Sequence, residues 1–492
     1  MKFYTNVIRH RNKILVRGIE NGVPYSETHH YKPYVFIPAG VQTKYRTLRG
    51  DHVGKIDFES MSAARQWIHD NEEVSGRKIY GLTDWVYQFI YERFPTTIKY
   101  DPSQISVVNI DIEVSVEDGF PDIQSANNEV TAITISRNGF KTVLGCGDYT
   151  NTRDDVKYYR CASERELLKA FLEIWNSVQY SPDVVTGWNI EFFDIPYLVN
   201  RIRRVLGESE SLRLSPWGVL DEYTVELRGR ENIAYKPLGI AVLDYIHLYK
   251  KFTYAEQESY KLDHIAYVEL GVKKLDYSEY SNLTDLYRNN FQKYIDYNIR
   301  DVELIEMLED KMKLIELVFT MSYDAKINFV DTLGSTKQWD IIIHNYLMDR
   351  CVVIPHVTRK SESVEFAGGY VKNPKVGMSK WVVSFDLNSL YPHLIMQYNI
   401  GPETFITRLD DTASIDDILT GKISKYHDYL DRGNYSIAAN LCLYSREKQG
   451  FLAALMQKMY DDRSTYKKQM LDQKQLLEEI NKEMHARNIK YT

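Results

Sequence analysis

The chain has 492 residues, which is too long for a single hydrophobic core and predicts about three domains. Its composition, with 44% hydrophobic and 26% charged residues, is that of a folded protein and excludes a largely disordered chain. The net charge of −7 excludes a protein that coats nucleic acid through overall basicity, so any contact with DNA must be local.

The order of predicted elements indicates a multidomain protein with α+β and α/β parts. Short β-rich runs and one helical stretch predict a small α+β module first. An apolar strand, "ISVVNIDIEV", follows, and the strands after it give way to helices in the pattern of an α/β domain. A later strand, "WVVSF", ends at Asp386, and a helix begins at Phe451. The predicted domains are an N-terminal domain (1–105, to which 314–357 returns), an α/β domain (106–313), a strand-rich region (358–449) and a final helix (450–492).

Cysteine usage and hydropathy bear on the compartment. The four cysteines lie far apart without paired spacing, which argues against a zinc site or disulfides and for a reducing compartment. Charges interrupt the N-terminus, and no apolar run reaches membrane-spanning length. We therefore expect a soluble intracellular protein with no membrane partner.

Two carboxylates lie on the first strand of the α/β domain. Asp111 and Glu113 are two residues apart, so the period of a strand directs both side chains to one face. Converging carboxylates repel each other unless a cation or a proton lies between them. The alternative is an edge strand with its polar face in water, but the apolar flanks on both sides disfavour it.

Two further segments contain aspartates, Asp194 and Asp301, that are candidates for the same site. In "TGWNIEFFDIPYL", Asp194 precedes a helix, and its alternative role is a plain N-cap. In "YIDYNIRDVELIEML", Tyr297 and Asp301 are i,i+4 on the inward stripe of a helix. The alternative there is a buried Asp–Arg pair with Arg300 or Arg204.

Taken together, four carboxylates and one phenol from one domain predict a metal-dependent phosphodiesterase. Mg²⁺ and Mn²⁺ prefer oxygen ligands, and a site with two such ions needs several carboxylates around the scissile phosphate. Tyr297 would orient the attacking water by a hydrogen bond. No serine, cysteine or histidine nucleophile is required.

The strings "DIE", "NxxxFD" and "YxxxD", in this order, resemble the exonuclease motifs of family B DNA polymerases. The whole chain, with strings such as "VLDYIHLYKKF" and "GFPD", resembles the N-terminal part of the polymerases of T-even-type bacteriophages. The resemblance implies an RNase H-like 3′→5′ exonuclease domain with a mixed sheet, and location in the cytoplasm of an infected bacterium. It also implies roles for individual residues. Asp111, Glu113, Asp194 and Asp301 would ligate metal, and Tyr297 would orient the water. Asn189 and Phe193 would hold the DNA 3′ end, Phe120 would pack against the unpaired strand, and a hairpin near Arg228 and Arg230 would separate the strands.

The string "SFDLNSLYP" resembles polymerase motif A of the same family. The resemblance implies that Asp386 and the Leu387 carbonyl hold metal, that the N–H groups of Asn388, Ser389 and Leu390 contact the triphosphate, and that Tyr391 excludes a 2′-hydroxyl. Arg463 and Lys467, at i,i+4 on the final helix, would bind the incoming deoxynucleoside triphosphate.

Several motifs that this family needs for synthesis are missing from the sequence. No N-S-x-Y-G string and no D-T-D string follow Asp386, so the second metal-holding aspartate is not supplied. The helix from Phe451 carries an apolar stripe without a predicted partner. We therefore predict a split polymerase, in which a second polypeptide supplies the remaining palm, fingers and thumb and the contact with a sliding clamp. A truncated chain would have the same sequence.

Two other functions compete with this prediction. The first is an autonomous exonuclease that acts on single-stranded DNA, with the palm strands a remnant. The second is a non-catalytic nucleic-acid-binding regulator, which predicts no metal-dependent nuclease.

Overall fold

The structure is a computed structural model, and it describes residues 1–72, 77–116, 121–227, 230–356, 369, 371–409, 420, 422 and 433–487. The chain divides into two compact units, Met1–Pro38 with Gly54–Arg350 and Ala39–Val53 with Cys351–Thr492. The predicted domain limits at residues 105 and 313 fall inside the first unit and stay predictions. Among the described residues, no helix has the length and apolar character needed to span a bilayer.

The N-terminal part of the first unit is built on an antiparallel sheet in the order β1-β2-β3. Its apolar side chains share a core with the helices near residue 320. The Tyr4 hydroxyl donates to the Ile327 carbonyl at 2.8 Å, and the Tyr323 hydroxyl donates to the Tyr4 carbonyl at 2.7 Å. Segments more than 300 residues apart are therefore held together. The elements of this part are β1 (Lys2–His10), β2 (Lys13–Glu20), β3 (Val23–His29), β4 (Tyr34–Pro38), α1 (Met61–Glu72), α2 (Trp85–Arg93) and the 3-10 turn η1 (Pro102–Gln104).

A six-stranded mixed sheet in the order β10-β9-β8-β7-β11-β14 forms the centre of the first unit. β7 pairs antiparallel with β8 and parallel with β11. The predicted mixed sheet of an α/β domain is confirmed. Its strands are β7 (Val107–Val114), β8 (Val130–Arg137), β9 (Phe140–Gly145), β10 (Val156–Arg160), β11 (Val184–Thr186) and β14 (Ala241–Val242).

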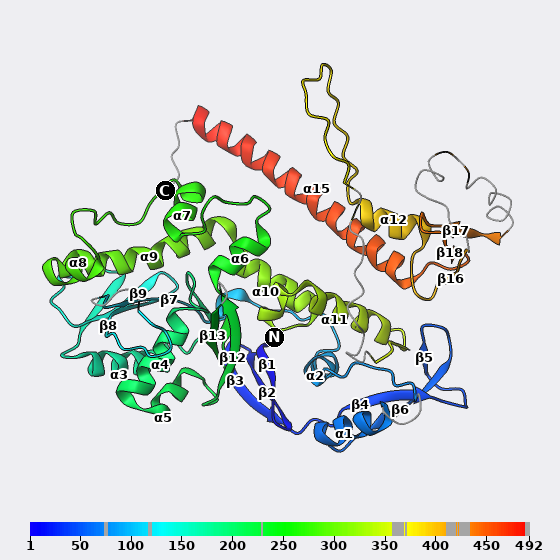
Figure 1. Cartoon of the computed structure of the whole chain (residues 1–492), viewed down its shortest axis with the longest axis horizontal. Helices are drawn as coiled ribbons and strands as arrows, with labels where there is room; N and C mark the ends of the chain where they lie inside the picture. Colours follow the sequence, from blue (N-terminus) through cyan, green and yellow to red (C-terminus); the bar gives the residue numbers. More distant parts are fainter. Residues whose placement is uncertain are drawn as a thin grey trace. The chain divides into compact units, whose positions relative to one another are not determined.

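Helices cover both faces of this sheet (Figure 1). Apolar side chains of β7, such as Ile110 and Ile112, share a core with α3 and α4. The opposite face packs on α9, where Ile295 and Ile299 contact Ala132 of β8 and Val143 of β9. Because side chains alternate along a strand, Asp111 and Glu113 face α9. The helices are α3 (Glu164–Trp175), α4 (Asp194–Leu206) and α9 (Phe291–Met312).

The remaining elements of the first unit surround this layered core. Leu220–Leu227 (β12) and Arg230–Pro237 (β13) form an antiparallel hairpin. Lys313, with φ +55, ends α9 and separates it from the next helix. The other elements are α5 (Glu208–Ser211), η2 (Leu212–Leu214), α6 (Tyr245–Phe252), α7 (Leu262–Leu270), α8 (Leu283–Asn289), α10 (Leu314–Ala325), η3 (Phe329–Leu333) and α11 (Ser335–Met348).

The described residues of the second unit form strands of small sheets and the packed helices α12 and α15. β5 pairs with β15 and with β6, and a second sheet has the order β16-β18-β17. The helix α12 packs against α15, where the rings of His393 and Tyr460 lie 4.7 Å apart. The elements are β5 (Tyr45–Thr47), β6 (His52–Asp57, which continues into the first unit), β15 (Val352–Val353), α12 (Leu390–Tyr398), β16 (Phe405–Arg408), β17 (Tyr435–Ile437), β18 (Cys442–Ser445) and α15 (Phe451–Ala486).

The predicted strand before Asp386 is wrong. Residues 382–387 form neither a strand nor a helix, and Val382, Val383 and Phe385 are 77%, 72% and 91% exposed. The segment has β-forming residues, but a strand also needs hydrogen-bonded neighbours, and none of the described strands pairs with it.

Candidate active site

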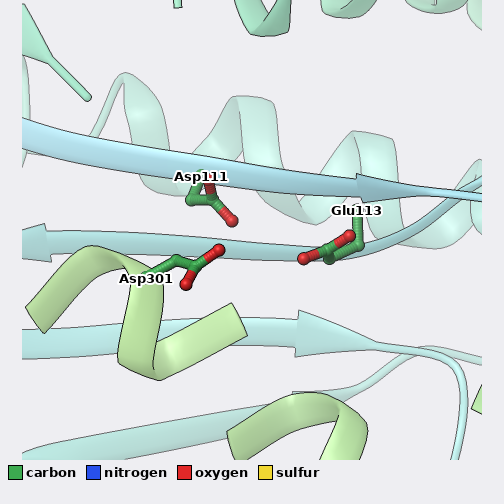
Figure 2. Close-up of side chains that lie close together, drawn as sticks. All are labelled: Asp111, Glu113 and Asp301. Carbon is green, nitrogen blue, oxygen red and sulfur yellow. The ribbon is translucent and has the colours of Figure 1, made fainter. Parts of the chain in front are cut away.

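Three carboxylates converge where β7 passes α9. Asp111 and Glu113 project from β7, and Asp301 reaches them from α9 (Figure 2). One oxygen from each carboxylate lies within 4.8 Å of the others. Glu113 and Asp301 are 8% and 4% exposed, whereas Asp111 is partly open to solvent. The structure thus brings together three of the four predicted acids.

A lysine partly neutralises this acidic group. Lys274, in the segment after α7, has its Nζ 2.5 Å from Asp301 Oδ2 and donates to the Tyr297 hydroxyl at 3.2 Å. Although burial opposes it, the charge of Asp301 keeps the pKa of Lys274 raised. The predicted Asp–Arg alternative is therefore wrong, because the partner of Asp301 is a lysine. Burial, followed by the charge of Asp301, raises the pKa of Tyr297, so its phenol stays protonated and able to donate.

The negative charges inside the cage are not fully compensated. Burial, followed by the charges of Asp301 and Glu113, raises the pKa of Asp111 well above its usual range. Burial and the charge of Asp301 raise the pKa of Glu113 to about 8. The Asp301 Oδ1 atom is buried and has no hydrogen-bond partner among the described residues. Buried, repelling carboxylate oxygens with a free acceptor fit hard divalent cations, for which oxygen is the preferred ligand.

The position of Asp111 is fixed by a neighbour of Asp301 on the same helix. Asn298 is fully buried and donates from Nδ2 to Asp111 Oδ2 at 2.7 Å. Its own carbonyl oxygen accepts from the Thr134 hydroxyl on β8, directly opposite Asp111 in the strand register. Both polar ends of Asn298 are therefore used, and α9 is held in register with β7.

The fourth predicted acid, Asp194, lies beside the group of three rather than within it. Its Oδ1 accepts from the Ile112 backbone N–H at 3.1 Å, between Asp111 and Glu113 on β7. Burial, opposed by this hydrogen bond, raises the pKa of Asp194 to about 7. Asp194 is the first residue of α4 and Phe193 is the N-cap, so the N-cap alternative for Asp194 is wrong.

A buried carboxylate, Asp244, holds the loop before α4. It accepts from the backbone N–H groups of Asn189 at 2.9 Å and Glu191 at 3.0 Å, and it also caps α6. Asn189 has φ +67, a left-handed conformation that this anchor stabilises. The side chain of Asn189 is exposed, and the Phe193 ring stacks on Tyr197 at 5.8 Å. The two residues predicted to contact the 3′ end thus lie on a loop fixed by one carboxylate.

The same loop is connected to the β12–β13 hairpin. The Tyr223 hydroxyl on β12 donates to Glu191, and His247 Nδ1 lies 3.1 Å from Glu191 Oε2. The predicted hairpin is therefore present, while its role in strand separation stays a prediction. Phe120 and Arg228 lie outside the described residues, and Arg230 is described only as the backbone start of β13.

The residues predicted for nucleotide binding lie in the second unit. Asp386, Leu387 and Asn388 are exposed, Ser389 has φ +53, and Leu390 begins α12. Tyr391 is 68% exposed. Tyr460, which contacts His393, is followed on the same stripe of α15 by Arg463 and Lys467, both exposed. The side chains predicted to bind triphosphate therefore continue a stripe that contacts α12.

Sequence reasoning missed three residues of the first site. Lys274 lies in an irregular segment beside another lysine, which is typical of solvated surface. Asn298 lies between two predicted residues but carries no charge to mark it. Asp244 falls within the quoted string "VLDYIHLYKKF", where the D-Y-I sequence is that of an ordinary helix N-cap.

Two parts of the chain match domains of known proteins. Residues 84–265 match "DNA polymerase family B, exonuclease domain", and residues 327–489 match "DNA polymerase family B". Tyr297 and Asp301 lie between the two matched ranges.

Three curated relatives illustrate the similarity. The DNA-directed DNA polymerase of Escherichia phage RB69 is 33% identical over 525 residues, covering 99% of this chain and 56% of the relative. The corresponding polymerase of Enterobacteria phage T4 is 32% identical, covering 98% and 55%. The DNA polymerase catalytic subunit of Human herpesvirus 7 is 26% identical, covering 74% and 36%. The chain thus spans about half the length of the phage relatives it matches. Consecutive matches to an exonuclease and a polymerase domain, with phage polymerases similar over nearly the whole chain, show that the chain belongs to the family B DNA polymerases.

Proposed function

We propose that the first unit is a 3′→5′ exonuclease that removes nucleotides from single-stranded DNA ends. The observation that carries this proposal is the convergence of Asp111, Glu113 and Asp301, with Lys274 and Tyr297 at the edge of the group. The match of residues 84–265 to the exonuclease domain of the family supports it.

We assign roles from the geometry. Asp111, Glu113 and Asp301, with Asp194 beside them, would hold Mg²⁺ or Mn²⁺. Two bound divalent cations would activate the attacking water and stabilise the leaving 3′ oxygen. Tyr297 donates its phenolic proton to orient the water. Burial raises the pKa of Asp301, and the charge of Lys274 opposes that rise. The Asn189–Phe193 loop, fixed by Asp244, would contact the 3′ end.

The test of this proposal is the double variant Asp111→Ala/Glu113→Ala. On a 5′-labelled single-stranded oligonucleotide with Mg²⁺, we expect the wild-type protein to give a ladder that shortens from the 3′ end and the variant to give none. Glu256→Ala/Glu258→Ala is the matched control, because these two exposed glutamates have the same spacing. Equal digestion by the Asp111/Glu113 variant would refute the proposal, and retained DNA binding shows that the variant is folded.

We also propose that the second unit contributes half of a polymerase site. Asp386 and the Leu387 carbonyl would hold metal, while the N–H groups at the start of α12 would contact the triphosphate, as helix N-termini do. Arg463 and Lys467 would bind its phosphates, and Tyr391 would select a deoxyribose. The ligands are primer-template DNA and deoxynucleoside triphosphates.

DNA synthesis, in this proposal, requires a second polypeptide that supplies the remaining palm, fingers and thumb and contacts the sliding clamp. Two exposed apolar surfaces support it. One is the segment around Trp381, Val382 and Phe385, which pairs with none of the described strands. The other is the distal half of α15, where Met470, Leu477 and Ile480 are 47%, 53% and 43% exposed, whereas Ala453 and Leu455 at its start are buried.

Primer extension tests the split arrangement. The purified chain is mixed with a candidate polypeptide that carries the missing N-S-x-Y-G and D-T-D strings, and extension is measured with and without Asp386→Ala. We expect extension only from the mixture, its loss in Asp386→Ala, and unchanged 3′ digestion in that variant. Failure of every such polypeptide to restore synthesis favours the autonomous exonuclease instead.

A further inference from the structure

A basic cavity lies in the first unit, apart from every residue assigned above. It has a volume of about 670 Å³ and is bounded by the β1–β2 turn, the start of α1 and the base of the β12–β13 hairpin. The ionisable residues of its lining are Arg9, His10, Arg11, Arg65, Lys236 and Asp221. One acid faces four permanent cations, in a protein whose overall charge is −7.

The cavity arginines have little counter-charge, since Asp221 is the one acid in the cavity lining. Arg9, Arg11 and Arg65 form no ion pair with any described residue. Each of the following arginines forms at least one ion pair with a carboxylate: Arg17, Arg153, Arg201, Arg203 and Arg213. Burial, followed by the charge of Arg9, lowers the pKa of Arg65, so the two guanidinium groups are close enough to repel each other. Neighbouring uncompensated cations form a positive potential that an anion relieves.

The elements that carry the cations are fixed against one another or constrained locally. The Ser62 backbone N–H at the start of α1 donates to Asn12 Oδ1 at 3.0 Å, which fixes the β1–β2 turn against α1. Arg11, in that turn, has φ +54, a conformation that arginine adopts uncommonly. Arg65 Nε donates to the Met61 carbonyl at 3.3 Å, and Lys236 Nζ lies 4.2 Å from the centre of the Tyr223 ring. The basic groups therefore come from three elements that converge on one cavity.

We propose that this cavity binds the phosphodiester backbone of single-stranded DNA. Guanidinium groups match phosphate geometry with paired hydrogen bonds, and cations spread over three elements can contact successive phosphates. The cavity volume of about 670 Å³ is many times the volume of about 30 Å³ that one water molecule occupies. It can therefore hold more than a single phosphate group. The inference rests on the proposed nuclease function, because the hairpin base that lines the cavity belongs to the matched exonuclease range.

The test measures DNA binding rather than digestion. The affinity of Arg9→Ala/Arg65→Ala for a labelled single-stranded oligonucleotide is measured by fluorescence anisotropy in EDTA over a range of NaCl concentrations. We expect affinity to fall about tenfold and the slope of log K against log[salt] to become shallower by about 1.4, for two lost phosphate contacts at about 0.7 each. The control Lys169→Ala/Arg204→Ala removes the same charge from two other exposed positions and should change neither value.

Three further measurements make the outcome decisive. Arg9→Lys/Arg65→Lys should keep most of the salt slope, and an unchanged thermal midpoint shows that each variant is folded. Inorganic phosphate should displace the oligonucleotide no better than chloride at equal ionic strength. The proposal is overturned if the alanine variant behaves like its control, or if free phosphate competes selectively through Arg9 and Arg65. Binding is measured without divalent cations, so it does not depend on digestion. If Asp111→Ala/Glu113→Ala failed to abolish digestion, the binding result for Arg9 and Arg65 could still be interpreted separately.

Discussion

Lys274 Nζ lies 2.5 Å from Asp301 Oδ2 and 3.2 Å from the Tyr297 hydroxyl, so one cation joins the acid and the phenol that sequence analysis assigned to a single motif. The Lys274 backbone N–H is itself anchored by Asp263 Oδ1 at 2.9 Å, on α7. The segment after α7 has no regular secondary structure, but these contacts fix the Lys274 ammonium group beside Tyr297 and Asp301 on α9.

Replacing Lys274 with methionine should impair digestion more than folding. Without its counter-charge Asp301 takes up a proton, which weakens cation binding, and we expect kcat to fall about 10- to 100-fold, as for other residues that orient metal ligands. The free energy of unfolding should fall by about 2 kcal/mol, less than for a fully buried pair, because Lys274 is partly exposed and Asp301 can be neutralised. Kinetics and urea unfolding measure both. Lys273→Met is the control, and an equal loss of activity there would contradict the assignment.

Tyr297→Phe removes only the phenolic hydroxyl. We expect the ring packing against Tyr277 to persist, with the ring centroids 5.3 Å apart, and the rate of digestion to fall about tenfold or more. Tyr277→Phe is the matched control in the same aromatic pair. Single-turnover digestion separates the chemical step from binding, and an unchanged single-turnover rate in Tyr297→Phe would show that the hydroxyl does not orient water.

Cation affinity should rise steeply with pH. In the cation-free protein, the pKa of Glu113 is raised to about 8 and that of Asp194 to about 7. At neutral pH Glu113 is therefore mostly protonated and Asp194 about half protonated, and a bound cation must displace these protons. We therefore expect Mn²⁺ affinity to increase between about pH 6 and 8 and to level off above that range. Calorimetry in buffers of different ionisation enthalpy counts the released protons. Affinity that is independent of pH would contradict the raised pKa values.

Asp244→Ala should loosen the loop that carries Asn189 and Phe193. The variant leaves the Asn189 and Glu191 N–H groups without their acceptor and removes the cap of α6, for a stability loss of about 1–3 kcal/mol. We expect KM for the 3′ end to rise more than kcat falls, because the loop contacts the end rather than the reacting phosphate.

Asn282→Ala is the matched control for Asp244, since it removes the cap of α8, a helix without predicted site residues. A similar loss of stability with unchanged KM is expected there. If both variants changed KM alike, the effect of Asp244 would be one of general stability rather than of loop position.

The fold and site were predictable where local periodicity decides the outcome. The two-residue spacing of Asp111 and Glu113 on a strand and the i,i+4 spacing of Tyr297 and Asp301 on a helix correctly place each pair on one face. That the two pairs form one site was predicted from the resemblance to a family. No local sequence pattern shows which helix face covers which strand.

What could not be predicted depends on distant partners. Lys274 is 27 residues from Asp301 in sequence, and only the packing of the segment after α7 brings them into contact. The prediction of a strand before Asp386 was wrong for a related reason. Val382 and Val383 favour β structure, but a strand also needs a neighbouring strand for its hydrogen bonds.

The most direct test is anomalous diffraction from crystals soaked in Mn²⁺ at a pH above 8. We predict peaks bounded by the carboxylate oxygens of Asp111, Glu113 and Asp301, and their disappearance in Asp111→Ala/Glu113→Ala crystals. A wild-type map with no peak between these three side chains, under conditions in which the protein digests DNA, would contradict the account.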